Sequence, residues 1–374
     1  MKVKTFVILL VAAGVLVALV YLRLGSEKQA GSDDMGETLF AELPVNTVAR
    51  IIIADTDNKV TLTKGENFWQ VQERNGYPAD FDELRDTVVK LSRLKIGRSF
   101  TSTDDSLKRL SLMPPSTADK DAGGTQISLV DAAGKTIADV ILGQTRKAEG
   151  GGSGGQYLKT VDGDTVYLVD NNFRFLKTAP AEWLRKEILD IKSDLVSSVT
   201  CYAGDNPKPV YTLQRPEKGK AVQVTPVPEG READASKIDQ VMDALSPLSI
   251  DDVAAADGSA AHTGHRLVYS LLDGREITIL PAAVGGERYT IRVVAAGALK
   301  RAVDDAEKQE ASAVKDDDAE NAAQADDAAT SVKTSQEINR DLGPWVFSIK
   351  KWQFDSFITQ PDGLLNEVED QSKS

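Results

Sequence analysis

Residues 79–96 read ADFDELRDTVVKLSRLKI, and residues 233–250 read ADASKIDQVMDALSPLSI. Both stretches open with Ala-Asp, and apolar residues then recur every three or four positions, as on a helix with one buried face. The two stretches keep a constant spacing of 154 residues, as between Asp80 and Asp234. Each aspartate stands where a helix N-cap is expected, and Glu83 is placed to complete a capping box in the first stretch. The chain therefore contains an internal repeat.

Short strands are expected on both sides of each helix, because β-branched and aromatic residues alternate there between turn residues. Before the helices, the expected strands are 48–54, 60–64 and 69–73, then 196–202, 210–214 and 221–225. After the helices, they are 127–130, 136–142, 157–159 and 166–169, then 266–272, 276–280, 289–292 and 346–349. Turns such as Asp57-Asn58 are typical of antiparallel hairpins. The pattern predicts an α+β fold of two tandem domains, each an antiparallel sheet with one main helix.

The expected domain boundaries follow from this repeat and from the composition of the connecting segments. They are a transmembrane helix at 1–24, a flexible tether at 25–38, a first repeat at 39–193, a second repeat at 194–360 and a polar tail at 361–374. The segment Trp183–Asp190 is expected to form a helix that joins the two copies. An acidic, low-complexity insertion at 298–342 interrupts the second copy, where the first copy has only a short turn.

The N-terminal stretch Phe6–Leu22 carries no charge and is flanked by Lys4 and Arg23. As a helix it is roughly 26 Å long, which suffices to cross a bilayer core as an uncleaved signal anchor. A cleaved signal peptide is the alternative, although residues 21–26 contain no clear small-x-small cleavage site. A lipoprotein is excluded, because the only cysteine is Cys201. The basic N-terminus favours a single-pass protein of the bacterial inner membrane with most of the chain in the periplasm.

The overall charge and the rare residue types exclude several function classes. The chain has 44 Lys and Arg against 57 Asp and Glu, a net charge of -13, so nucleic acid is not an expected partner. One cysteine and two histidines exclude a disulfide scaffold and a cysteine-rich zinc site.

A glycine-rich run at 150–155 matches two catalytic patterns. Gly151-x-Ser153-x-Gly155 resembles a nucleophile elbow, and Gly150-x-Gly152-x-x-Gly155 resembles a dinucleotide-binding fingerprint. Both patterns require a strand before the loop and a helix after it, whereas a polar segment precedes this run and a strand follows it. We therefore expect a hairpin connection.

The other candidate residues also point to structural roles. His262 and His265 are placed to supply half of a metal site, but loop histidines are the simpler expectation. The acidic run Asp316–Asp318 lacks the spacing of an EF-hand loop, so a solvated segment is expected in place of a cation site or an acidic docking arm. Cys201 alternates with Val199 in an expected strand and is predicted to be buried. The sequence thus assigns no catalytic, cofactor-binding or metal-binding residue, although a pair of facing carboxylates remains possible.

Aromatic residues gather in two parts of the chain. They are Trp69, Tyr77, Tyr157, Tyr167, Phe173, Phe175 and Trp183, then Trp345, Phe347, Trp352, Phe354 and Phe357. Such clusters form the cores of small β-rich domains or line a groove for glycan or lipid, and the core is the favoured interpretation.

Several segments together resemble a known family. They are Leu43–Ile51, Trp69-Gln70-Val71, Tyr77–Asp80, Gly155-Gln156-Tyr157, Val166–Asp170 and Trp183–Ile191. In this order, behind an N-terminal apolar stretch, they resemble the bacterial membrane family known as domain of unknown function 4340, most strongly over residues 39–200. Members are similar in context to auxiliary proteins of gliding-motility-type ABC transport systems, and the family supplies no catalytic residue to match here.

The resemblance implies a non-enzymatic, periplasm-facing accessory subunit of an ABC-2-type transport system. Its expected partners are the membrane and an ABC permease or companion subunit, and no cofactor is implied. The alternative from another class is an envelope module that binds glycan or lipid, and a carboxylate-based hydrolase is a remote third.

Overall fold

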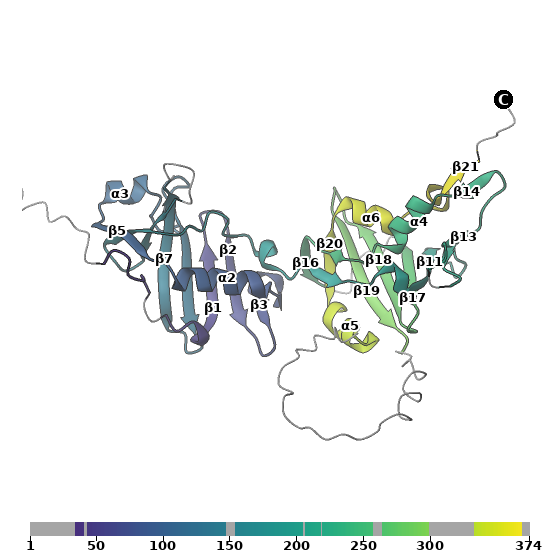
Figure 1. The fold of residues 1–374 in the computed structure, drawn as a ribbon, viewed down its shortest axis with the longest axis horizontal. Helices are drawn as coiled ribbons and strands as arrows, with labels where there is room; N and C mark the ends of the chain where they lie inside the picture. Colours follow the sequence, from purple (N-terminus) through teal and green to yellow (C-terminus); the bar gives the residue numbers. More distant parts are fainter. Residues whose placement is uncertain are drawn as a thin grey trace, which may run out of the picture. The chain divides into compact units, whose positions relative to one another are not determined.

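The computed structural model describes residues 34–40, 43–146, 154–204, 206–217, 219–256, 264–298 and 333–368. The chain divides into two compact units, Met1–Leu184 and Arg185–Ser374 (Figure 1). The described part is 41% strand and 20% helix. The expected α+β class is therefore wrong, because large antiparallel β-sheets dominate both units and helices are a minor component.

A nine-stranded antiparallel sheet forms the first unit, in the order β4-β3-β2-β1-β6-β7-β8-β9-β5. Its strands are β1 (Val48–Ala54), β2 (Lys59–Lys64), β3 (Trp69–Val71), β4 (Tyr77–Pro78), β5 (Ile96–Thr101), β6 (Thr125–Asp131), β7 (Thr136–Thr145), β8 (Gln156–Thr160) and β9 (Thr165–Val169). Its helices are α2 (Phe81–Ser92) and α3 (Asp104–Arg109). Figure 1 shows α2 lying across the sheet.

The second unit contains an eight-stranded sheet in the order β13-β12-β11-β17-β18-β19-β20-β16. These strands are β11 (Val196–Ala203), β12 (Tyr211–Gln214), β13 (Gln223–Thr225), β16 (Asp252–Ala255), β17 (His265–Leu271), β18 (Glu276–Ala283), β19 (Tyr289–Ala296) and β20 (Trp345–Ile349). Two short pairs accompany it, β10 (Glu187–Leu189) with β15 (Leu248–Ser249), and β14 (Arg231–Ala233) with β21 (Leu365–Glu367). The helices are α4 (Ala235–Met242), α5 (Ser335–Leu342) and α6 (Lys351–Phe357).

Each repeated helix buries one of its faces. On α2, Leu84, Val88 and Leu91 are buried, and on α4 the buried set is Ile238, Val241 and Met242. Each such side chain contributes about 1.5–3 kcal/mol relative to an exposed position. The apolar spacing that identified the repeat is thus the core-facing stripe of each helix.

The two units share one strand order. The series β3-β2-β1-β6-β7-β8-β9-β5 in the first unit matches β13-β12-β11-β17-β18-β19-β20-β16 in the second. In each unit, a residue near its beginning accepts a hydrogen bond from a residue that follows the repeated helix. Ile96 N donates to Glu37 O over 2.9 Å in the first unit, and Ile250 N donates to Lys186 O over 3.0 Å in the second.

A residue near the end of each unit accepts a hydrogen bond from the N-cap residue of the repeated helix. Trp183 O accepts a hydrogen bond from Asp80 N over 2.8 Å, and Leu364 O accepts one from Asp234 N over 2.9 Å. The predicted N-caps are confirmed, because the side chains of Asp80 and Asp234 accept from backbone N–H groups of the first turn. The expected capping box at Glu83 is wrong: Trp183 O already takes the Asp80 N–H, and Glu83 pairs with Lys177 over 3.1 Å.

The connection between the units also differs from expectation. The expected helix at Trp183–Asp190 is absent: Glu187–Leu189 is strand β10, which pairs with β15 inside the second unit. The division of the chain therefore falls after Leu184, whereas we expected it after residue 193. The expected polar tail from 361 likewise begins later, because residues 361–367 form a short 3₁₀ turn and β21, with Leu364 buried.

Two expected segments fall largely outside the described residues. The predicted membrane helix at 1–24 is one of them, and no helix among the described residues is long and apolar enough to cross a bilayer. The acidic insertion at 298–342 is the other: residues 299–332 lie outside, while Ser335–Leu342 forms α5.

Candidate functional site

Cys201 is buried on β11, as predicted, and stands opposite Tyr211 of β12. Burial raises the pKa of its thiol to about 11, because a thiolate there is poorly solvated. The same burial raises the pKa of the Tyr211 phenol above its ordinary value. A thiol held neutral in a sheet core is a packing group, and nucleophilic chemistry at Cys201 is disfavoured.

Only His265 of the predicted histidine pair can be followed in the structure. His265 is the first residue of β17, and its Nδ1 has no hydrogen-bond partner among the described residues, while His262 lies outside them. No group of three or more His, Cys, Asp and Glu side chains in the described ranges is arranged to hold a metal ion. The run Asp316–Asp318 also lies outside these ranges.

The glycine-rich run has a structural role where it can be followed. Residues 147–153 lie outside the described part, so neither catalytic pattern can be traced in full. Gly155 directly precedes β8, and a Cβ atom there would collide with the carbonyl oxygen of Val169 on β9. This glycine permits close contact between two strands.

Half of the twelve clustered aromatic residues are buried in the cores. Tyr77, Trp183 and Phe173 are buried in the first unit, and Phe347, Phe354 and Phe357 in the second. Two rings are exposed: Phe175 is 82% exposed and Trp352 is 60% exposed. The favoured core interpretation therefore holds for these six residues and fails for these two.

An apolar groove lies in the first unit between α2 and strands β1–β3. The first-unit groove has a volume of about 430 Å³, and its apolar floor is formed by Val45, Ile51, Trp69, Leu84 and Val88. A second hollow of about 410 Å³ shares Lys64, Trp69 and Phe81 with it.

Two exposed phenylalanines lie beside these hollows: Phe81 lines both, and Phe68 lines the second one. Phe81 is 54% exposed at the start of α2, and Phe68 is 45% exposed beside β3. Arg85 also lines the groove and pairs with Asp82 and Asp86 at 3.4 and 3.3 Å, so its charge is balanced locally. The arrangement combines aromatic surface with a charged rim, which is the composition of a protein-docking patch.

A second groove lies in the second unit, between α6 and the loop that follows α4. This Trp352 groove has a volume of about 620 Å³. Lys350 and Trp352 line it from the start of α6, and Asp243, Ser249 and Asp251 line it from the loop.

A hydrogen bond from Gln353 joins the two walls of the Trp352 groove, and two further bonds lie within the α6 segment. Gln353 Nε2 donates to Ser249 O over 2.9 Å, while Gln353 Oε1 accepts from Lys350 N over 3.1 Å. Ser356 Oγ donates to Trp352 O over 3.2 Å. Because Gln353 is buried and bonded at both ends, it fixes α6 relative to the loop.

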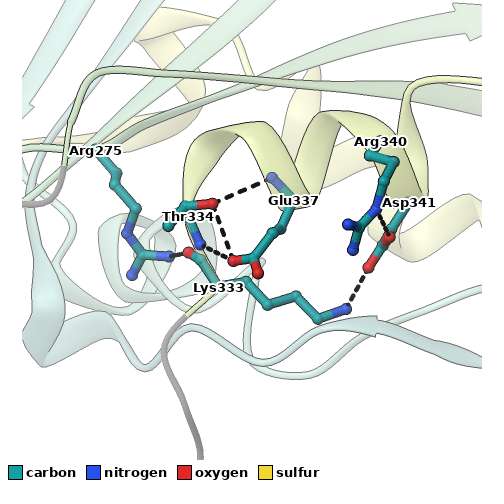
Figure 2. A network of polar contacts seen from close by, with 6 residues as sticks. All are labelled: Arg275, Lys333, Thr334, Glu337, Arg340 and Asp341. Carbon is teal, nitrogen blue, oxygen red and sulfur yellow. Dashed lines mark hydrogen bonds and ion pairs between the residues drawn. The ribbon is translucent and has the colours of Figure 1, made fainter.

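The most connected group of charged side chains surrounds the start of α5 and faces neither groove (Figure 2). Thr334 and Glu337 form a capping box, and Lys333 Nζ reaches Asp341 over 2.8 Å. Arg275 Nη1 donates to Lys333 O over 2.7 Å and pairs with Asp273. These contacts start and anchor a helix, so we assign them a structural role.

Trp352 was expected in an aromatic core, and its exposure was missed. The signal was the spacing of Phe354 and Phe357, which bury one side of α6 and leave Trp352 on the other. The segment follows β20 directly, and the turn of α6 was not anticipated there.

Comparison with known proteins gives one match. The family model described as Domain of unknown function (DUF4340) matches residues 69–265, which is more than half of the chain. Neither the curated proteins nor the solved structures contain a match. The matched range includes the helix and several strands of both units, and the chain belongs to this DUF4340 family.

Proposed function

We propose that this protein is a non-enzymatic accessory subunit that docks on a component of an ABC-2-type transport system, at the periplasmic side of a bacterial inner membrane. The observation that carries this proposal is the exposed ring of Phe81, which lines both the first-unit groove and the second hollow, with the exposed Phe68 in that hollow. Large exposed aromatic side chains beside an apolar groove commonly mark protein–protein contact sites.

Two sequence features support the location and the class of partner. The uncharged stretch Phe6–Leu22 favours residence at a membrane, where a local partner is met at high effective concentration. The resemblance to auxiliary proteins of gliding-motility-type transport systems names the class of partner. The chain has a net charge of -13, which favours a protein partner over nucleic acid because nucleic acid is itself negatively charged.

Site-specific photocrosslinking tests this proposal. A photoreactive phenylalanine analogue replaces Phe81 in the full chain, and crosslinks formed in native membranes are identified by mass spectrometry. Phe175 is the matched control position, because it is an exposed phenylalanine of the same unit that lines neither described groove. We expect adducts with an ABC permease or its companion subunit from position 81 and none from position 175. Recovery of only self-adducts, or of equal adducts from both positions, contradicts the proposal.

A further inference from the structure

The Trp352 groove in the second unit has the features of a small-ligand site. We propose that it binds a neutral oligosaccharide, with one sugar ring stacked on Trp352. Its volume of about 620 Å³ lies within the range of ligand pockets in proteins, about 300–1,000 Å³. The site is independent of the docking proposal, because it uses other residues in the other unit.

Trp352 provides a flat aromatic platform at this groove. The helix α6 is anchored by Phe354 and Phe357, which are buried, whereas Trp352 points away from this core and is 60% exposed. Leaving so large an apolar ring in water is unfavourable, so a ligand that covers it gains by removing its surface from solvent. The apolar face of a sugar ring covers such a surface while its hydroxyl groups reach the polar atoms at the edge.

The first unit has different residues at two positions that line this groove in the second unit. Phe173 is the fourth residue after β9, and Gln353 is the fourth residue after β20. Phe173 is buried and lies against the side chain of Lys90, with Lys90 Nζ 4.8 Å from the ring centroid. In the second unit, Ala244 stands 154 residues after Lys90, so a small residue replaces a long one at this position. Ala244 and Gln353 both line the Trp352 groove. The residues Ala244 and Gln353 that line this groove therefore differ from the residues at the matching places in the first unit.

The charges along the Trp352 groove cancel. Lys186 and Lys350 contribute two positive charges, and Asp243 and Asp251 contribute two negative charges. A phosphate or carboxylate ligand requires an excess of cations or of backbone N–H donors, which this lining does not supply. A sugar hydroxyl both donates and accepts hydrogen bonds, so it is matched by a lining that mixes ammonium, carboxylate and amide groups.

The backbone of the groove is already engaged, which disfavours an extended peptide as the ligand. Ile250 N donates to Lys186 O over 3.0 Å, and Asp251 N donates to Ser348 O over 2.8 Å. The carbonyl of Ser249 accepts from Gln353. Recognition of an extended peptide by strand addition needs a row of unpaired backbone groups, whereas these three groups are already paired.

A glycan array followed by calorimetry tests the proposal. The full-length protein, purified in detergent, is applied to an array of neutral and anionic oligosaccharides, and the strongest neutral hit is titrated. We expect retention of at least one neutral oligosaccharide. Trp352→Ala is expected to weaken its binding about tenfold or more, and Trp352→Phe to have an intermediate effect.

Controls separate loss of binding from loss of folding. Trp352 is mostly exposed, so its variants should keep the melting temperature of the parent protein. Phe175→Ala removes an exposed ring from the first unit and should leave glycan binding unchanged. Retention of no oligosaccharide, retention of anionic ones alone, or equal binding by folded Trp352→Ala overturns the proposal. None of these outcomes affects crosslinking at position 81, so the two proposals fail separately.

Discussion

Cys201 offers a direct test of burial at the scale of one residue. Burial raises the pKa of its thiol to about 11, so only about one molecule in a thousand carries a thiolate at pH 8. We expect Ellman's reagent to leave the native protein unlabelled over an hour at pH 8. The same reagent should release one equivalent of chromophore after unfolding in guanidinium chloride, since Cys201 is the only cysteine. Rapid labelling of the native protein is the contrary result.

The ion pair between Asp273 and Arg275 makes stability depend on pH. The Arg275 side chain is 7% exposed, and its Nη2 lies 2.6 Å from Asp273 Oδ2. Burial alone raises the pKa of Asp273, but the hydrogen bonds from Arg275 outweigh it, and the pKa is lowered overall. The pair therefore contributes stability above the unfolded-chain pKa of about 3.9, and this contribution is lost as the pH falls through the lower folded value.

Asp273→Asn is accordingly expected to lower the free energy of unfolding by about 2 kcal/mol at neutral pH. The deficit should shrink as the pH falls below about 3.9, where the parent protein loses the same charge. Urea unfolding at a series of pH values measures both effects. Asp162→Asn, which removes an exposed carboxylate from a turn, serves as the control and should change stability by less than about 0.5 kcal/mol. A deficit that is independent of pH would show that charge is not the cause.

The start of helix α4 gives a prediction at the scale of an element. Asp234 Oδ1 accepts from Ser236 N and Lys237 N at 3.0 and 3.2 Å. Asp234→Ala removes this cap and should cost about 1 kcal/mol of stability, measured by chemical denaturation. Asp239→Ala changes an exposed position on the same helix and should cost less. Equal losses from both variants would mean that the cap contributes little.

One strand and two helix N-caps could be predicted, because residues within a short stretch of sequence determine them. Strand β1 spans Val48–Ala54, the predicted range, and the N-caps at Asp80 and Asp234 are in place. Alternation along a strand and a capping aspartate are both visible within one short window.

Other elements were missed or wrong because distant residues decide them. Leu94 and Ile96 were assigned to the helical stripe, yet α2 ends at Ser92, and Ile96 begins β5, which is held by β9. Residues 187–189 were expected to be helical and are extended because β15 pairs with them. The orientation of the short helix α6 depends on which of its aromatic side chains are buried in the core. Phe354 and Phe357 are buried, and Trp352 is exposed.

At the scale of the whole molecule, the constant spacing of the repeat identified the two copies but not the residues at which each copy begins and ends. The limits are set by contacts between ends, such as Trp183 O with Asp80 N in the first unit and Leu364 O with Asp234 N in the second. These contacts join residues about a hundred or more positions apart, which no local window includes.

Residues 295–296 and 335–339, which lie on either side of segment 299–332 in the sequence, contact each other in the second unit. Ser335 Oγ donates to Ala296 O over 2.8 Å, and the Asn339 amide makes two 2.7 Å hydrogen bonds with the backbone of Ala295. Because these contacts hold the two sides together, replacing residues 299–332 with a short Gly-Ser linker should leave the melting temperature within about 2 °C of the parent value.

Calorimetry of the deletion variant and the parent protein checks this prediction. Asn339→Ala is the matched comparison, because it breaks the contact itself and should destabilise both proteins by about 1–3 kcal/mol. A large loss of stability on deletion alone would show that residues 299–332 support the fold.

Because the two units share one strand order, a position in one unit can be compared with the matching position in the other. Where the two units agree, as in the aspartates that begin α2 and α4, the common residue marks what the architecture demands. Where they diverge, as between Lys90 and Ala244, the two units carry different side chains at one place in the shared fold. A chain that carries two copies of one fold can thus vary the surface of either copy while both keep the same architecture.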